Sequence, residues 1–158
     1  MSSVTSDSAV TLQRITAETL DDILDLEVAE AQKDFVASNE RSLAQAHFDD
    51  GAWFRAIYAD EIPVGFMLLH DESLCAEPQE PGYFYLWRIM IDQRFQRMGF
   101  GRRALRLLLA HVKTRPLAEK LHVSWRPGEG SAQGFYEKLG FTVTGMDDDG
   151  EVQAYLDL

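Results

Sequence analysis

The stretch LWRIMIDQRFQRMGFGRRALRLLL, residues 86–109, carries the strongest structural signal in this chain of 158 residues. It begins inside a run of aromatic and aliphatic residues, 83–91, which favours a central β-strand buried on both faces apart from Arg88. It ends in alanines and leucines at helical spacing, which predict a helix over residues 101–113. A loop with two glycines separates the two. The stretch therefore predicts a strand, a glycine-containing loop and a helix in succession.

The other predicted elements surround this unit in a regular order. Strands are predicted at residues 10–15, 53–59, 63–70, 120–125, 141–144 and 151–156, and helices at residues 16–28, 40–48 and 131–140. Strand, two helices, three strands, helix, strand, helix and two strands indicate a mixed α/β fold with a partly antiparallel sheet. We expect residues 1–9 to be a flexible tail and residues 10–158 to form a single domain.

Composition and charge narrow the class of function. The net charge of −11 argues against a general nucleic-acid binder and favours either cationic small molecules or a plain solvated acidic surface. Cys75 is the one cysteine and the four histidines are scattered, so neither a disulfide nor a metal site is predicted. The N-terminus lacks a signal peptide, and the longest apolar run is too short for a membrane span, so we expect a cytoplasmic protein.

The loop before the predicted helix has the features of an anion site. Gly99 and Gly101 allow close approach of a ligand to the backbone, and a helix start offers unpaired N–H groups. The same region holds five arginines of an otherwise acidic chain: Arg94, Arg97, Arg102, Arg103 and Arg106. The pattern is neither a dinucleotide fingerprint nor a Walker loop. A solvated, arginine-bearing helix after a tight turn explains the same residues, so the loop alone leaves both interpretations open.

Two segments together resemble one family. Residues 86–109 resemble motif A of the GNAT N-acetyltransferases, and AQGFYEKLGF, residues 132–141, resembles their motif B, in the same order and at similar spacing. The resemblance implies the GNAT fold, a mixed and mostly antiparallel central sheet flanked by helices, with acetyl-CoA as co-substrate. Within the family, VAEAQKDFVASN, YLWRIMID and DDGEVQAYLDL look most like bacterial spermine/spermidine acetyltransferases.

The resemblance also implies roles for individual residues. Loop N–H groups would bind the pyrophosphate, and the end of the preceding strand would hold the pantetheine arm and polarise the thioester carbonyl. Tyr136 would be the general acid that protonates the departing thiolate, although a tyrosine packed at a helix edge is the alternative. The implied coenzyme-binding residues are Met90, Ile91, Gln96, Arg97, Met98, Gly99, Phe100, Gly101, Arg102, Ser131 and Phe135.

The general base is harder to assign than the acid. Only about one primary amine molecule in a thousand is neutral at pH 7, so a proton has to be removed. Some polyamine acetyltransferases carry a carboxylate on the central strand for this purpose, and the corresponding position here is Trp87, next to Arg88. A second departure is Glu129, where many relatives have an asparagine that contacts the coenzyme. We expect Glu129 to point away, with that contact either missing or made by Ser131 instead.

Candidate residues for binding the amine are acidic or aromatic. Glu27, Glu30 and Asp34 are spaced to share one face of the first predicted helix, either as a site for a polycation or as a solvated surface. Tyr85 and Trp87 could offer aromatic faces to an ammonium group or could be core residues.

The expected function is acetyl transfer to a primary amine, with polyamines such as spermidine or spermine as the leading acceptors. Attack would be direct, in a ternary complex, because Cys75 lies outside both motifs. An aminoglycoside, amino acid or protein amine is an alternative acceptor, and a non-catalytic acyl-CoA-binding regulatory module is an alternative of another class. The family resemblance further implies a possible homodimer.

Overall fold

The computed structural model describes residues 3–158, and its elements follow the predicted order. The strands are β1 (Val10–Gln13), β2 (Ala52–Ala59), β3 (Ile62–Asp71), β4 (Phe84–Ile91), β5 (Lys120–Trp125), β6 (Thr142–Met146) and β7 (Val152–Asp157). The helices are α1 (Leu20–Leu24), α2 (Asn39–His47), α3 (Phe100–Val112) and α4 (Gln133–Lys138), with 3-10 turns η1 (Glu30–Gln32), η2 (Glu72–Leu74) and η3 (Gln93–Phe95). The prediction of a mixed α/β fold is confirmed.

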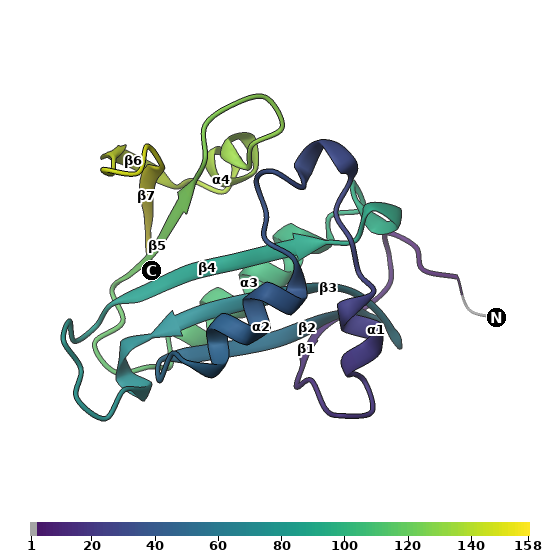
Figure 1. Ribbon diagram of the computed structural model, residues 1–158, viewed down its shortest axis with the longest axis horizontal. Helices are drawn as coiled ribbons and strands as arrows, with labels where there is room; N and C mark the ends of the chain where they lie inside the picture. The colour runs from purple at the N-terminus through teal and green to yellow at the C-terminus, as the bar shows by residue number, and fades with distance from the viewer. Residues whose placement is uncertain (1–2) are drawn as a thin grey trace.

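All seven strands form one sheet in the order β1-β2-β3-β4-β5-β7-β6 (Figure 1). Every pair is antiparallel except β4–β5, which is parallel because α3 carries the chain back across the sheet between them. The strand over residues 83–91 is therefore central, as predicted.

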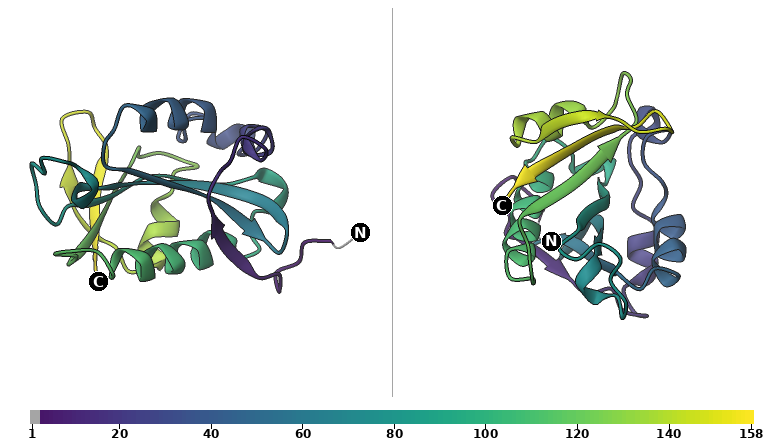
Figure 2. Two further views of the ribbon diagram at one scale, coloured as in Figure 1. Left: turned by 90° about the horizontal axis from the view of Figure 1, so that it is seen from below. Right: turned by 90° about the vertical axis from the view of Figure 1, so that its left-hand side faces the viewer.

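Helices cover both faces of the sheet, with α3 on one face and α1 and α2 on the other (Figure 2). Alternate residues of β3 supply the two cores, because successive side chains of a strand point to opposite faces. Met67 belongs to the same core cluster as Leu105 and Leu108 of α3, whereas Phe66 belongs to the cluster that contains Ile23 of α1. Burial of these apolar side chains holds the helices against the sheet. Among residues 3–158, no helix is long and apolar enough to cross a membrane.

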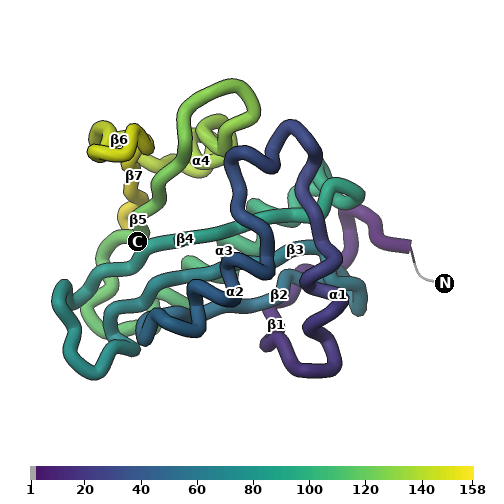
Figure 3. Tube along the Cα trace, viewed as in Figure 1, coloured from purple at the N-terminus to yellow at the C-terminus, as the bar shows by residue number. Residues whose placement is uncertain are grey.

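The centre of the sheet is split between β4 and β5. Their ladder consists of the pairs Tyr85↔His122 and Leu86↔Val123, after which the two strands diverge (Figure 3). A β-bulge reinforces the split, because the register against β3 skips Trp87. The expectation that this strand is buried on both faces apart from Arg88 is wrong for Tyr85, Trp87, Ile89 and Ile91, which are only partly buried because they border the opening, whereas Phe84, Leu86 and Met90 are buried.

The first helix is shorter than predicted. The spacing predicted residues 16–28, but α1 ends at Leu24. The reason is tertiary hydrogen bonding: the Glu27 N–H donates to a carboxylate oxygen of Asp92 at 2.9 Å, and the Glu27 carbonyl accepts from the Gln93 N–H at 2.8 Å. These bonds use the backbone groups that a continuing helix would need.

The segment before β1 packs against α3. Ser8 is buried, and the Arg103 guanidinium donates to the backbone carbonyls of Ser6 and Ser8, at 2.8 Å each. Ser6 and Ser8 are therefore bonded to an arginine on α3, and the flexibility expected of the N-terminal tail stays a prediction. Residues 1–2 lie outside the described part of the chain.

Candidate active site

A cavity of about 600 Å³ fills the opening between β4 and β5. Its walls come from both strands, the loop before α3, the start of α3 and α4, and one end is covered by the segment between α1 and α2, where Phe35 packs against Gly128 and Gly130. The predicted site residues that line the cavity are Tyr85, Trp87, Met90, Ile91, Gln96, Arg97, Gly99, Phe100, Gly101, Arg102, Ser131, Phe135 and Tyr136.

The loop before α3 presents a row of free backbone donors. Among the described residues, none of the N–H groups from residue 96 to residue 102 donates a hydrogen bond. Gly99 is the N-cap of the 13-residue helix α3 and has a φ of 81°, a conformation that glycine adopts without strain. Arg97 also has a positive φ, 66°, which is strained for a side-chain-bearing residue. Free N–H groups at a helix start are suited to bind phosphate oxygens.

Of the five arginines of this region, two line the cavity and two are bonded elsewhere. Arg97 and Arg102 line the cavity, whereas Arg94 pairs with Asp92 at 2.8 Å and Arg103 holds the N-terminal segment. Arg88 of β4 and Arg126 after β5 line the cavity instead, so part of its positive charge comes from outside the predicted arginine group. Sequence spacing can group only arginines that are close along the chain. It does not indicate that Arg88 and Arg126 lie at the same cavity, because the pairing of the strands places them there.

Tyr136 is buried in an aromatic cluster at the cavity wall. Its ring stacks on Trp125 with centroids 5.4 Å apart and meets Phe135 and Phe141 edge-on at 5.3 and 5.2 Å. Burial, with a smaller contribution from Tyr85, raises the pKa of the Tyr136 phenol well above its usual range. The phenol is therefore protonated at neutral pH, which suits a proton donor.

On the face of the sheet opposite α3, a short chain of hydrogen bonds reaches into the cavity. The Tyr85 hydroxyl is bonded to the Ser124 hydroxyl, and Ser124 donates to Oε2 of Glu151 at 3.1 Å. Ser124 and Glu151 were not among the predicted site residues. The antiparallel register of β5 with β7, which pairs Trp125 with Val152, places Glu151 beside the diverging end of β5.

Arg88 lies on the same face and is partly buried. Its Nη1 donates to the Trp87 carbonyl at 2.9 Å and its Nη2 to Oε1 of Gln45 at 3.3 Å. Its Nε is buried without a hydrogen-bond partner among the described residues. Burial lowers the pKa of the Arg88 guanidinium, with opposing contributions from Tyr85 and Glu151.

The predicted acidic triplet does not form. Because α1 ends early, Glu27, Glu30 and Asp34 do not share one helix face; all three are exposed, outside the cavity lining. Glu30 pairs with Lys33 at 3.0 Å, so its charge is partly compensated.

Three other predictions concern the coenzyme side of the cavity. Met98 does not line the cavity, because its side chain packs against the core beneath α3. Ser131 lines the cavity as expected of a coenzyme contact, and α4 begins after it, with Ala132 as the N-cap. Glu129 is exposed and outside the lining, in line with the expectation that it points away.

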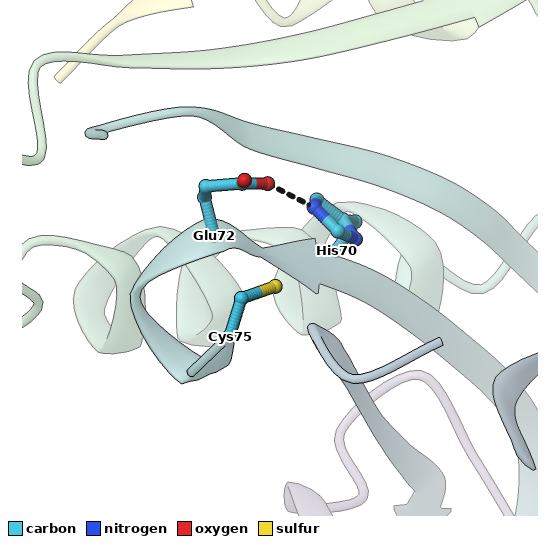
Figure 4. Close-up of side chains that lie close together, drawn as sticks. All are labelled: His70, Glu72 and Cys75. Carbon is cyan, nitrogen blue, oxygen red and sulfur yellow. Dashed lines mark hydrogen bonds and ion pairs between the residues drawn. The ribbon is translucent and has the colours of Figure 1, made fainter. Parts of the chain in front are cut away.

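A second group of chemically reactive side chains lies at the other end of β3. His70 Nε2 is 2.6 Å from Glu72 Oε2, and the ligand atoms of His70, Glu72 and Cys75 all lie within 4.8 Å of one another (Figure 4). Asp49 bonds to Nδ1 of His70 at 2.9 Å on the other side. The histidines looked scattered in the sequence, whereas η2 brings one of them together with two possible metal ligands. None of the four residues lines the cavity between β4 and β5.

Comparisons with known proteins agree with this architecture. A model of the acetyltransferase (GNAT) family matches residues 20–141. The spermine/spermidine N(1)-acetyltransferase of Bacillus subtilis (strain 168) is 25% identical over 146 residues, which cover 90% of this chain and 95% of that protein. The crystal structure of PaiA N-acetyltransferase from Thermoplasma acidophilum in complex with coenzyme A has a TM-score of 0.72 at 15% identity, covering 95% of this chain and 99% of that one. An aminoglycoside acetyltransferase in complex with coenzyme A has a TM-score of 0.75 at 17% identity, covering 94% and 95%.

Proposed function

Because the chain belongs to the acetyltransferase (GNAT) family and is an acetyl-CoA-dependent N-acetyltransferase, we propose that it acetylates a primary amine of a polyamine. The observation that carries the proposal is the cavity between β4 and β5, which combines free backbone donors, a buried protonated phenol and a carboxylate. Spermidine and spermine are the leading acceptors, because a relative that matches nine-tenths of this chain is named for them.

The residues at the start of α3 fit the anionic part of the coenzyme. The N–H groups from residue 96 to residue 102 would hold the pyrophosphate oxygens, and Arg97 and Arg102 would add charge. A side chain on Gly101 would approach the ring of Phe135, so the glycine keeps this part of the cavity open. Beyond Leu86, the edge of β4 has no pairing with β5, which leaves backbone groups near Met90 and Ile91 for the pantetheine arm.

Acetyl-CoA, when bound, supplies an activated thioester. A main-chain N–H of the diverging half of β4 would stabilise negative charge on the carbonyl oxygen. Tyr136 would donate its phenolic proton to the sulfur as the acetyl group moves to the amine. Its raised pKa keeps that proton in place at neutral pH, and the stacking on Trp125 holds the ring in one orientation.

A panel of amines tests the proposal. We expect acetyl-CoA-dependent turnover with spermidine and spermine that exceeds turnover with aminoglycosides, amino acids and peptide amines by at least about tenfold in kcat/KM, with mass detection of the acetylated product. Equal or greater activity on another amine class would contradict the polyamine assignment. Binding of coenzyme A without transfer to any amine would favour the regulatory-module alternative.

One observation favours a second class of acceptor. The buried Nε of Arg88 lacks a partner among the described residues, and an unpaired buried donor costs about 1–3 kcal/mol. An acceptor that carries a carboxylate, such as an amino acid or the end of a peptide, would satisfy it. Preference for such amines in the panel, lost in Arg88→Met, would establish this second candidate. The expected cytoplasmic location and possible homodimer remain predictions.

A further inference from the structure

The residue that receives the proton of the attacking amine has no obvious place on β4, because Trp87 and Arg88 occupy the positions next to the bulge. An ammonium group nevertheless has to enter the cavity and lose a proton there. Among the residues that line the cavity, Glu151 is the single carboxylate, whereas Arg88, Arg97, Arg102 and Arg126 all carry positive charge. A cationic acceptor therefore has one favourable electrostatic partner within the cavity.

The surroundings of Glu151 leave it available for a ligand. Oε2 accepts the proton of the Ser124 hydroxyl, and the Tyr85 hydroxyl therefore donates to Ser124. Oε1 has no hydrogen-bond partner, and Glu151 forms no ion pair with any residue of the described chain. The carboxylate is thus oriented through one oxygen while its other oxygen and its charge remain free.

We propose that Glu151 binds the ammonium group of the acceptor and takes its proton, with Ser124 and Tyr85 as positioning residues. This inference rests on the acetyl transfer proposed above. The ammonium N–H bond breaks and its proton passes to Oε1 of Glu151, while the nitrogen lone pair forms the C–N bond to the acetyl carbon. The C–S bond breaks, and the sulfur takes the phenolic proton of Tyr136. Once the C–N bond has formed, the nitrogen loses a second proton to water, which leaves a neutral amide. After product release, Glu151 returns its proton to water and the Tyr136 phenolate takes one from water, so one proton is released per turnover.

Other charged groups around this carboxylate are compatible with the role. Arg88 faces it from β4 but holds the Trp87 carbonyl and Gln45 instead. From the hairpin between β6 and β7, Asp147 accepts a hydrogen bond from the Glu151 backbone N–H at 2.8 Å, which fixes the main chain and adds negative charge. The negative charge of Asp147 favours an incoming cation near Oε1, whereas Arg88 opposes it but forms no ion pair with Glu151 within the described chain.

The test compares Glu151→Gln with wild type, using spermidine or the best acceptor of the amine panel. The amide can still accept the Ser124 hydrogen bond, so the change removes charge and basicity. We expect kcat/KM at pH 7 to fall about 100-fold while the dissociation constant for coenzyme A stays within about twofold. The loss should shrink at pH 9.5, where more of the amine is already neutral. Glu151→Asp should retain part of the activity, and Asp148→Asn, an exposed change on the same hairpin, should match wild type.

Two results would overturn the inference: activity of Glu151→Gln within threefold of wild type at pH 7, or an equal loss at pH 7 and pH 9.5. Calorimetry of spermidine binding to the coenzyme A complex separates this inference from the proposed function. About tenfold weaker binding in Glu151→Gln supports the ammonium site even if no amine is acetylated. Unchanged binding together with unchanged turnover rejects it even if the enzyme acetylates polyamines.

Discussion

The ring of Phe135 lies 3.3 Å from the position that a Cβ would occupy on Gly101. This contact joins the first turn of α3 to α4, the two helices that bear the proposed phosphate-binding and acid groups. A glycine at this position lets the helices approach each other without displacing the aromatic ring that borders the cavity.

We predict that Gly101→Ala weakens coenzyme binding. The added methyl group would push Phe135 toward the cavity, an overpacking cost that corresponds to about tenfold in the dissociation constant for coenzyme A. Gly134→Ala, in the first turn of α4, is the matched control, because apart from its chain neighbours and its own helix backbone no atom lies within 4 Å of the position that its Cβ would occupy. Calorimetry should show unchanged coenzyme binding for the control; equal affinities for both variants would refute the packing argument.

Tyr136→Phe should abolish most turnover without unfolding the protein. Phenylalanine keeps the ring contacts with Trp125 and Phe141 but has no proton to donate, so we expect kcat to fall about 100-fold. Because the pKa of Tyr136 is raised, its ionisation should not reduce wild-type kcat between pH 7 and 10. Steady-state kinetics over this range, with Tyr155→Phe as a control outside the cavity, would reveal a decline or a fully active variant if the acid role were wrong.

The network around His70 should stabilise the fold within a limited pH window. Burial would lower the pKa of His70, but hydrogen bonds and charges of Glu72 and Asp49 raise it above its usual value of about 6.5. Protonated His70 therefore stabilises the folded state. This stabilisation is fully present when the pH is below the usual pKa of histidine, and it is lost as the pH rises through the higher pKa that His70 has in the folded protein. The hydrogen bond with His70 lowers the pKa of Glu72 in the folded protein. The stabilisation from ionised Glu72 is fully present when the pH is above the usual pKa of glutamate, about 4.3, and it is lost as the pH falls through the lower pKa of the folded protein.

The His70 contribution is lost toward high pH and the Glu72 contribution is lost toward low pH. Their combined stabilisation of the fold is therefore largest between about pH 5 and 6. Urea unfolding of wild type and His70→Asn should therefore differ most in that window and less at pH 8.5. His47→Gln, a change at an exposed histidine on α2, serves as the control. A stability difference that grows steadily from pH 5.5 to 8.5 would contradict the assignment of a charged His70 between two carboxylates.

Turnover should not depend on a bound metal ion. None of His70, Glu72 and Cys75 lines the cavity, and the proposed proton transfers use only side chains of the protein. Overnight incubation with EDTA followed by gel filtration should leave kcat/KM unchanged, with the metal content checked by mass spectrometry. A loss of activity that Zn²⁺ restores in wild type but not in Cys75→Ser would instead give this cluster a functional role.

Much of the fold followed from local pattern. Helical spacing predicted α3 within a residue at each end, and β5 matches its predicted range, because both elements bury one regular face. The end of α1 was predicted wrongly, because the Glu27 N–H donates a hydrogen bond to the buried Asp92, which is 65 residues away in the sequence. No window of local sequence contains both partners of such a bond.

Local sequence was enough to specify the order of elements and the glycine loop that opens α3, and the resemblance of residues 132–141 to motif B indicated Tyr136 as the candidate acid. These features depend on residues that are neighbours along the chain. The packing of the sheet was needed to establish where β4 and β5 part, which arginines line the cavity, and that Tyr85, Ser124 and Glu151 meet. The last contact joins β4, β5 and the residue before β7 through the β4–β5 and β5–β7 registers, and a strand's own sequence does not specify its register with a distant partner.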